Sequence, residues 1–551
     1  RRPTVSRGWG PLDMMGAGEA PAGAELASYE PINAMRHVGI LPQELSGTVT
    51  GNVKADIPLQ AGVDSDRLGW LGALDYRGLS LAKPVDGQIV TAADGSIVVD
   101  PDKAVIRAGA QLNGIPAEID LVEPLERNGP PRSRKVALVI DDKTRETFMP
   151  GLSTLVSGTV KVALDKRQDG TQKVAADLTG ARLTIPWAGW SKGPGVPADV
   201  TFTMSRSGST TTLSDFELGG KSFAIDGSVV LSGGSLTSAA FGRVQLNRGD
   251  DVAVSVRRSA GNYAVKITGD SLDARPLIKQ FMSDADTATR GTSGEAISVS
   301  ATVKTLTGFN DERLSNLVLD YSAAGSRVNG LKVSAAAGSG AAISITDASG
   351  ADGRALNMRS ADAGAILRFL DIYPHMRGGA IALALTGGRS GALRGSVDAR
   401  NFLIVDEPKL ASIVSTPPAG DNRSLNQAVK ADIDASRVQF ERGYAEIEKG
   451  TGYLKLAKGV LRGPLIGTTF QGTLYDANDR MDMTGTFMPA YGINRIFGEL
   501  PLVGALLGNG RDGGLIGVTY RLKGDVAKPD LHINPLSAIA PGIFRSIFEY
   551  R

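Results

Sequence analysis

Apolar and polar residues alternate with a period of two along much of this chain, and Gly, Asn, Asp and Pro interrupt the pattern. Such alternation is typical of antiparallel strands with one wetted face, whereas strands of a buried parallel sheet form continuous apolar runs. The clearest stretches predict strands at residues 48–59, 156–165, 297–304, 429–436, 467–475, 481–487 and 516–522. The pattern therefore argues against an α/β nucleotide-binding fold.

The apolar positions of each predicted strand lie on one side of that strand, because successive side chains point to opposite faces. They could fill the core of a two-sheet sandwich, or they could form the wall of a trough that holds acyl chains. The alternation alone favours the sandwich, since one-sided patterning is the default for antiparallel sheets. The positions expected to line a trough are Val49, Val53, Ile57, Val156, Val160, Val162, Ile297, Val299, Val303, Val429, Ile433, Ile516, Val518, Tyr520 and Leu522.

Helical patterns are few. Residues 273–282 and 362–370 each begin with an Asp that can cap a helix, and apolar residues follow at helical spacing. Residues 22–39 also favour a helix, although Pro31 divides it. Residues 283–294 are small and polar without periodicity, which predicts a boundary between a region 1–288 and a region 289–551.

The end of the chain, residues 467–551, combines strands, a broken apolar hairpin at 489–507, further strands and an amphipathic terminus. On a helix, Ile543, Phe544, Ile547 and Phe548 would share one face. Burying four such side chains contributes roughly 6 to 12 kcal/mol before ordering costs. This terminus could dock on a membrane, on a partner protein or on the chain's own sheet, and the pattern leaves these alternatives open.

Composition supports a turn-rich β-protein and excludes several kinds of site. The chain has 69 Gly and only 5% aromatic residues, and its 60 basic and 58 acidic residues give a formal charge of +2. A charge so close to balance offers no field that would attract nucleic acid. With no Cys, the chain has neither disulfides nor thiolate metal sites. It has no apolar run of 18 residues and no recognisable signal peptide.

The sequence offers no catalytic constellation. His37, His375 and His532 are far apart and lie beside no acid–hydroxyl group. Asp141 and Asp142 would point to opposite faces of a strand, so we interpret them as the start of a loop. The glycines of residues 504–514 lack the spacing of a phosphate loop. We therefore expect no enzyme activity, no cofactor and no metal.

The C-terminal segment contains a series of short, distinct motifs. These are Gly485-Thr-Phe-Met-Pro489, Ile493-Asn494, Leu500-Pro-Leu-Val-Gly504, Gly517-Val-Thr-Tyr520, Gly524, Pro529 and Asn534-Pro-Leu-Ser537. In their order and spacing these motifs resemble the AsmA-like family of Gram-negative envelope proteins, and most closely its YhdP-type members. Shorter stretches at 46–51, 57–59, 363–367 and 377–379 are similar to the family's β-repeat and to its helix-then-strand entry.

This resemblance implies a mainly β protein whose long twisted antiparallel sheet, with a few short helices, forms a β-groove. Region 1–288 would be a truncated β-groove repeat, and region 289–551 the AsmA-like C-terminal region with its helical hairpin and amphipathic end. Related bridge-like proteins carry phospholipid through a hydrophobic groove in the periplasm, between the inner and outer membranes, and so support outer-membrane biogenesis. The expected partners are phospholipid acyl chains, both membranes and other envelope proteins, with the inner-membrane anchor helix on a part of the polypeptide that precedes this chain.

An alternative from another class is a non-enzymatic envelope scaffold or adhesin-like β-domain with a closed core. The two differ in what an Asp at Val160 or Val299 would do. In an open trough the change would block transport without unfolding, whereas in a closed core it would unfold the protein.

Overall fold

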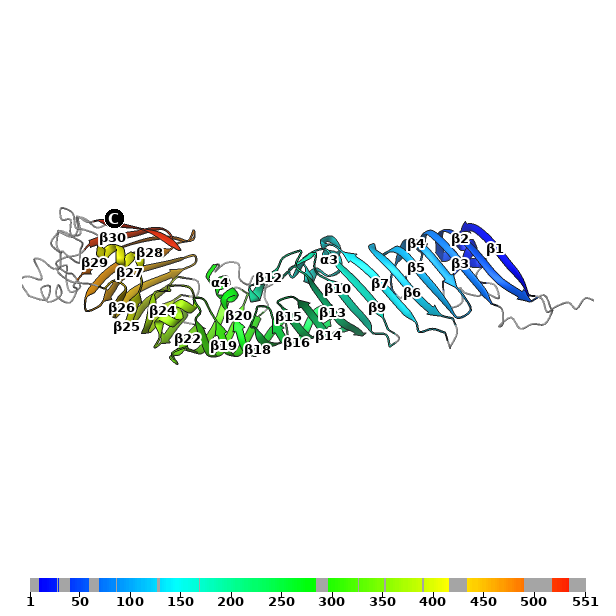
Figure 1. The fold of residues 1–551 in the computed structure, drawn as a ribbon. Coiled ribbons are helices and arrows are strands. Elements are labelled where there is room, and N and C mark those ends of the chain that lie inside the picture. The colour runs from blue at the N-terminus through cyan, green and yellow to red at the C-terminus, as the bar shows by residue number, and fades with distance from the viewer. Residues whose placement is uncertain are drawn as a thin grey trace, which may run out of the picture. The chain divides into compact units, whose positions relative to one another are not determined.

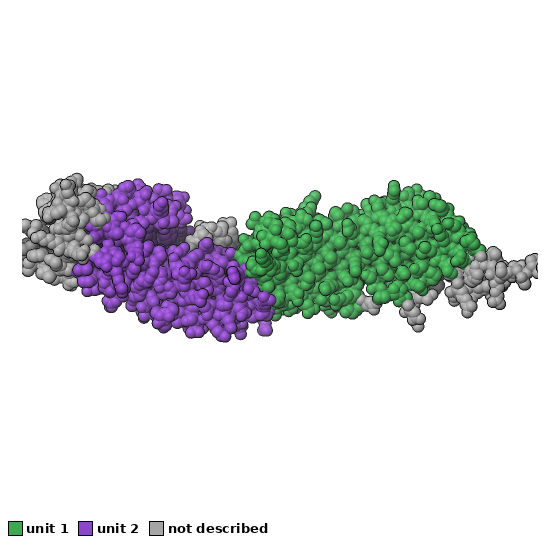
Figure 2. All heavy atoms as spheres, viewed as in Figure 1, with its two compact units in different colours: residues 1–186, 190–241 green, residues 187–189, 242–551 purple. Residues whose placement is uncertain are grey.

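The structure is a computed structural model, and it consists mainly of strands (Figure 1). It describes residues 9–26, 28, 40–58, 69–85, 87–125, 129–167, 169–283, 296–325, 327–350, 353–388, 391–415, 434–489 and 518–534. Within these residues, 28 strands belong to one hydrogen-bonded sheet and three form a second, small sheet. The chain divides into two compact units, residues 1–186 with 190–241 and residues 187–189 with 242–551 (Figure 2).

The first unit contains the strands from β1 onward and several short helices. Its strands are β1 (Trp9–Glu19), β2 (Leu45–Pro58), β3 (Trp70–Leu81), β4 (Val90–Val99), β5 (Lys103–Leu112), β6 (Ile115–Pro124), β7 (Ser133–Ile140), β8 (Val156–Gly158), β9 (Val160–Lys166), β10 (Gln172–Asp177), β11 (Ala181–Ile185), β12 (Trp190–Lys192), β13 (Ala198–Ser207), β14 (Thr210–Gly220), β15 (Ala224–Ser232) and the first part of β16 (Ser235–Gln245), whose last residues belong to the second unit. Its helices are α1 (Ala20–Leu26), α3 (Asp142–Phe148) and the 3₁₀ turns η1 (Pro42–Glu44) and η3 (Pro150–Leu152), and the 3₁₀ turn η4 (Pro186–Ala188) begins in this unit and ends in the second.

The second unit has the same strand-rich character. Its strands are β17 (Asp251–Ser259), β18 (Asn262–Asp273), β19 (Ala296–Thr307), β20 (Arg313–Ala324), β21 (Arg327–Ala337), β22 (Ala342–Gly350), β23 (Gly353–Ser360), β24 (Met376–Gly387), β25 (Leu393–Val405), β26 (Arg437–Gly450), β27 (Tyr453–Arg462), β28 (Ile466–Tyr475), β29 (Arg480–Pro489), β30 (Val518–Asp525) and β31 (Lys528–Asn534). Its helices are α4 (Arg275–Ser283), α5 (Ala363–Phe369) and α6 (Pro408–Ser415).

Strand pairing follows chain order almost throughout. In the first unit β7 pairs with β9 and β10 with β13, because β8, β11 and β12 form the separate small sheet. In the second unit β18 and β19 pair in parallel, and each later pair up to β30 with β31 is antiparallel. The expectation of a mainly β protein built on a long, mostly antiparallel sheet is confirmed.

Two of the predicted helices are present. Asp362 caps α5, since its carboxylate accepts a hydrogen bond from the Ala365 amide at 2.9 Å. At α4 there is no equivalent cap, since the Asp273 carboxylate accepts the amide of Arg275, the first helical residue, at 3.0 Å. Of the stretch predicted at 22–39, residues 22–26 belong to α1, and residues 29–39 lie outside the described residues.

One interpretation of the sequence was wrong. Asp141 and Asp142 do not begin a loop but open helix α3, where the Asp141 carboxylate accepts the Thr144 amide at 2.8 Å. The predicted boundary at residue 288 lies outside the described residues and stays a prediction. The contact-based division of the chain falls between Phe241 and Gly242.

The main sheet has two chemically distinct faces. The register places apolar residues beside one another, for example Leu74 beside Ile97 and Ile106 beside Leu121 in the first unit. In the second unit the same holds for Val299 beside Tyr321. We call this side the apolar face of each unit and the opposite side, which carries residues such as Asp75, Arg107 and Ser300, the polar face.

Glycines mark places where the sheet bends toward its apolar face. At Gly95, Gly227, Gly269, Gly395 and Gly485, all on that face, an added Cβ would overlap a backbone carbonyl of the neighbouring strand. At Gly109, on the polar face, nothing lies within 4 Å of an added Cβ. Crowding on one side and space on the other are expected on the inside and outside of a bend, and strand glycines are a common device for such bends. The apolar face is therefore the inner side of these bends.

Candidate functional site: the apolar face

The apolar face of the first unit is shielded but not packed shut. Leu74, Ile97, Ile106, Leu121 and Val136 on this face are half-buried. In contrast, large apolar residues on the polar face are more exposed, with Leu71 at 44%, Val98 at 39% and Val139 at 48%. The core of a filled sandwich would bury the five apolar-face residues named above almost fully. The face is therefore mainly an apolar surface whose residues shield one another, with one small buried cluster formed by Tyr76, Ala93 and Ala110.

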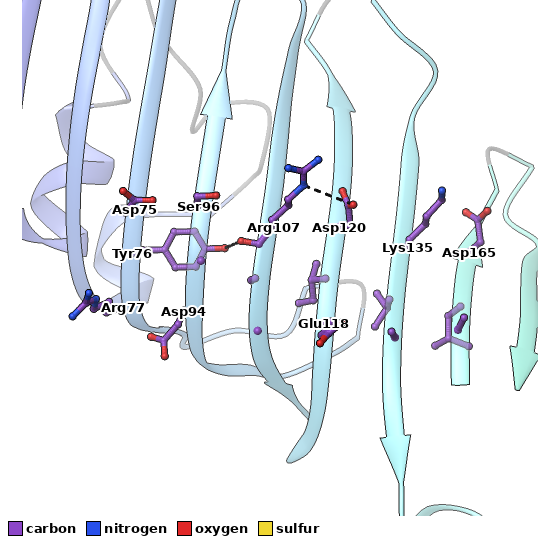
Figure 3. Close-up of a pocket in the computed structure, with 18 of the residues that line it drawn as sticks. Asp75, Tyr76, Arg77, Asp94, Ser96, Arg107, Glu118, Asp120, Lys135 and Asp165 are labelled. Atoms are coloured by element: carbon purple, nitrogen blue, oxygen red, sulfur yellow. Dashed lines mark hydrogen bonds and ion pairs between the residues drawn. The ribbon is translucent and has the colours of Figure 1, made fainter. Parts of the chain in front are cut away.

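The polar face of the same strands carries a ladder of charges. The register aligns Asp75, Ser96, Arg107, Asp120, Lys135, Asp165 and Lys173 across successive strands. Figure 3 shows most of these side chains extending from neighbouring strands. From Arg107 to Lys173 the charges alternate in sign, and Arg107 Nε lies 3.8 Å from Asp120 Oδ2. Cross-strand neighbours of opposite charge stabilise a sheet and keep its face wetted.

A hollow of about 1580 Å³ lies over this ladder. Its walls include Asp75, Arg77, Glu118 and Asp120, so it is unsuited to acyl chains. A second hollow, of about 890 Å³, lies on the polar face of the second unit and is lined by Ser300, Asp320 and Lys332 among others. Neither hollow offers a burial site for an apolar ligand.

One edge of the apolar face in the first unit is covered by the small sheet. Lys192, on β12, is buried, and its Nζ donates to the carbonyls of Leu178 at 2.6 Å and Ala181 at 2.7 Å. Burial lowers the pKa of the Lys192 ammonium. Trp190 packs edge-on against Phe223, with ring centroids 4.9 Å apart. These contacts fasten the small sheet against the ends of β10 and β14.

In the second unit part of the apolar face is packed shut by helices. A cluster of fully buried residues from α5, α6 and the strands β24–β30 lies here. Its members are Ala363, Met376, Phe402, Ile404, Ile413, Val414, Val438, Phe440, Ile466, Phe487, Val518 and Tyr520. Tyr373, partly buried against the cluster, donates its hydroxyl to Glu407 Oε2 at 2.7 Å, next to the start of α6. This region is a conventional filled core.

The structure places the predicted trough residues in several environments. Val49 and Val53 on β2, Val160 and Val162 on β9, and Ile297, Val299 and Val303 on β19 lie on the apolar face, as do Val518, Tyr520 and Leu522 on β30. Ile57 lies on β2 in the same register phase. Val156 lies apart from Val160 on β8 of the small sheet, since Gly158 has a φ of 93° and ends that strand. Val429, Ile433, Ile516, Ile543, Phe544, Ile547 and Phe548 lie outside the described residues.

Burial divides the residues that share the apolar face. Val303 and Val518 are 0% exposed and Val160 is 7% exposed, so they are packed core residues. Val49, Val53, Val162, Ile297 and Val299 are half-buried and can line a surface. The two positions chosen from sequence for an Asp test, Val160 and Val299, therefore belong to different classes, and only Val299 tests a trough.

Sequence reasoning missed three basic residues on the apolar face of the second unit. Arg258, Arg354 and Lys449 follow the apolar register of β17, β23 and β26. The alternation of apolar and polar residues could have identified them, because each stands at a position where its strand otherwise has apolar residues. That these residues lie close to tyrosines on other strands could be recognised only from the strand register.

The described part of the chain has no cluster of three or more His, Asp or Glu residues that could hold a metal ion. His375 is structural, since its Nδ1 lies 3.0 Å from the Val405 carbonyl oxygen. Among the helices that the structure describes, none has the length and apolar character needed to cross a membrane. Comparison with known proteins found no matching family model, no matching curated protein and no matching solved structure.

Proposed function

We propose that this chain carries phospholipids along its apolar face, as part of a bridge between the inner and outer membranes of a Gram-negative envelope. The observation that carries the proposal is the half-buried apolar face of a sheet that bends toward it, opposite a face of charge ladders. Acyl chains gain roughly 0.8 kcal/mol for each buried CH₂ group, and such a surface can supply that burial without specific contacts. The resemblance of residues 485–537 to AsmA-like proteins supports the periplasm as the location.

The cellular location in this proposal is that of the family that the chain resembles. The full polypeptide would be anchored in the inner membrane by a helix on a preceding part of the polypeptide, and other envelope proteins would contact its ends. The acyl chains of the transported molecules would be held by burial, so transport along this face needs no cofactor and no catalytic residue.

Lipid extraction and native mass spectrometry of the purified protein test the proposal. Phospholipid should copurify with the wild type, and Val299→Asp should release most of it while circular dichroism stays unchanged. Val299 lies on β19 and is half-buried on the apolar face. The matched control is Val318→Asp on the adjacent strand, because Val318 is 46% exposed on the polar face. Equal lipid loss in both variants, or no lipid in the wild type, would contradict the proposal.

A scaffold with a closed core is the second candidate, and the filled cluster beneath α5 and α6 favours it. If that packing continued over the whole apolar face, Val299→Asp would unfold the second unit because a buried carboxylate lacks a partner. The same experiment therefore separates the two functions, since unfolding rather than lipid release would support the scaffold.

A further inference from the structure

The outermost row of the apolar face in the second unit has a distinct chemistry. The register places Arg258 beside Tyr263 and Tyr263 beside Ile297. Farther along the same row, Ser349 pairs with Arg354, and Leu393 pairs with Lys449. Each basic residue stands next to a hairpin turn, since β17 ends at Ser259, β23 begins at Gly353 and β26 ends at Gly450. We call this row the basic rim.

At two places on the basic rim the basic residue lies directly against a tyrosine. The Arg258 guanidinium lies 5.5 Å from the centre of the Tyr263 ring. Lys449 Nζ lies 5.2 Å from the Tyr475 ring centre and donates to its hydroxyl at 2.7 Å. All of these side chains are half-buried. An apolar stem with a wet, charged or hydroxylic tip is the form that side chains take where an apolar region meets water.

Arg354 occupies the rim between those two places and is fixed differently. Its Nε donates to Asp347 Oδ1 at 2.8 Å, and its Nη2 contacts the other oxygen of that buried carboxylate. The hydrogen bonds to Asp347 raise the pKa of Arg354, and burial raises the pKa of the nearby Tyr321 hydroxyl. None of the described residues that the register places in the rim row is acidic, because Asp347 stands one row further in, beside Leu331 and Leu356.

The opposite edge of the same face is covered. Val252, Val303, Leu317, Ala335 and Ile343, which lie toward that edge, are all buried. Helices stand there, since the Ala274 amide at the start of α4 donates to the Thr307 carbonyl at 2.9 Å. The Phe309 amide also donates to the last residue of α5, at 3.1 Å from the Phe369 carbonyl. A lipid with its chains on this face can therefore turn its headgroup only toward the basic rim.

We propose that the basic rim binds the phosphate of lipid headgroups whose acyl chains lie on the apolar face of the second unit. This inference rests on the proposed function and adds to it the residues that hold the headgroup, which would favour phosphate-bearing lipids over neutral ones. Guanidinium and ammonium groups recognise phosphate oxygens through charge-assisted hydrogen bonds, and tyrosine hydroxyls can add further donors.

The test compares two lipids with identical acyl chains, phosphatidylglycerol and diacylglycerol, for binding to the whole chain in a native mass spectrometry competition. The test variant is Arg258→Gln with Lys449→Gln. Its control is Arg257→Gln with Lys455→Gln, which removes the same charge from the polar face. Arg257 neighbours Arg258 but points the other way, and Lys455 stacks on Tyr453 at 5.4 Å.

The wild type and the control should favour phosphatidylglycerol about fivefold, and the rim variant should bind both lipids equally. Arg258→Lys with Lys449→Arg should keep the preference. If the wild type binds both lipids equally, or if the control loses as much preference as the rim variant, the basic rim has no such role while the proposed function stands. If sn-glycerol 3-phosphate displaces phosphatidylglycerol at equal concentration, the rim is a soluble-phosphate site instead. Binding of neither lipid would overturn both proposals.

Discussion

The apolar faces of strands β3–β7 and of strands β25–β30 have the same alternating sequence pattern, but they are buried to different extents. In the first region Ile97, Ile106 and Leu121 remain half-buried beside one another. In the second, Phe402 and Phe440 are each 3% exposed, stacked 5.4 Å apart beneath α6. The pattern of a strand thus specifies which face is apolar, but the elements that pack on that face decide whether it becomes a core or a surface.

The largest expected effect comes from cutting into the filled region. Phe402→Ala should lower the free energy of unfolding of the second unit by about 3–5 kcal/mol, because it leaves a cavity in a packed core. Ile106→Ala in the half-buried region should cost the first unit only about 1–2 kcal/mol. Chemical denaturation, monitored by hydrogen exchange in each unit, measures both losses in the free energy of unfolding. Equal losses would show that the two regions are packed alike.

The second comparison is between two residues on the same face of β19. Val303→Asp should unfold the second unit, because Val303 is 0% exposed and the new carboxylate would have no partner. Val299→Asp, four residues earlier in the chain, should leave the unit folded, because Val299 is half-buried. Circular dichroism of the two variants checks the prediction, and a folded Val303→Asp variant would contradict it.

The bends of the sheet supply a third comparison, between glycines on its two faces. Gly95→Ala should destabilise the first unit by about 1–3 kcal/mol, because the new Cβ overlaps the Arg107 carbonyl and the strands must move apart. Gly109→Ala on the adjacent strand should be close to neutral, since nothing lies within 4 Å of its Cβ. Thermal unfolding measures the difference. If both variants behave alike, the apolar face is not the inside of a bend.

A smaller effect concerns the helix that opens beside the filled core. Asp362→Ala removes the hydrogen bond to the Ala365 amide and should cost about 1 kcal/mol. Asp362→Asn should restore most of that loss, because an amide oxygen can also accept the bond. Denaturation midpoints of the two variants provide the test, and an equal loss in both would show that the cap is not the cause.

The smallest effect is electrostatic. The hydrogen bond from Arg521 lowers the pKa of Asp482, which lies on the polar face of β29. The pairing therefore stabilises the folded state above the ordinary Asp pKa of about 4, and this contribution is lost as the pH falls through the lowered folded-state value. Asp482→Asn should remove this part of the acid dependence. The test is to measure the free energy of unfolding at decreasing pH, with Asp479→Asn as the control. If the two variants gave the same pH dependence, the assignment to Asp482 would be contradicted.

The fold could be predicted well from the sequence because alternation is a local property. The strand pattern around Val299 and the Asp cap of α5 could be recognised from neighbouring residues alone. The break between Val156 and Val160 could not, because it depends on Gly158 and on a pairing with β11. Nor could periodicity separate Val303 from Val299, since their burial is decided by residues distant in the chain.

The candidate site, too, could be predicted from the sequence only where it depends on local pattern. Periodicity identified the apolar face but not its closed part, because the helices that cover it pack through tertiary contacts. The basic rim became visible only when the register brought Lys449 and Tyr475 together from strands separated by β27.

The most direct test of the central claim uses a photo-crosslinking amino acid at Val299 and, separately, at Ser300. These neighbours point to the apolar and polar faces, respectively, of the same strand. After irradiation of the protein in cells, phospholipid adducts should form at position 299 and not at position 300. Adducts at both positions, or at neither, would contradict an apolar face that holds acyl chains.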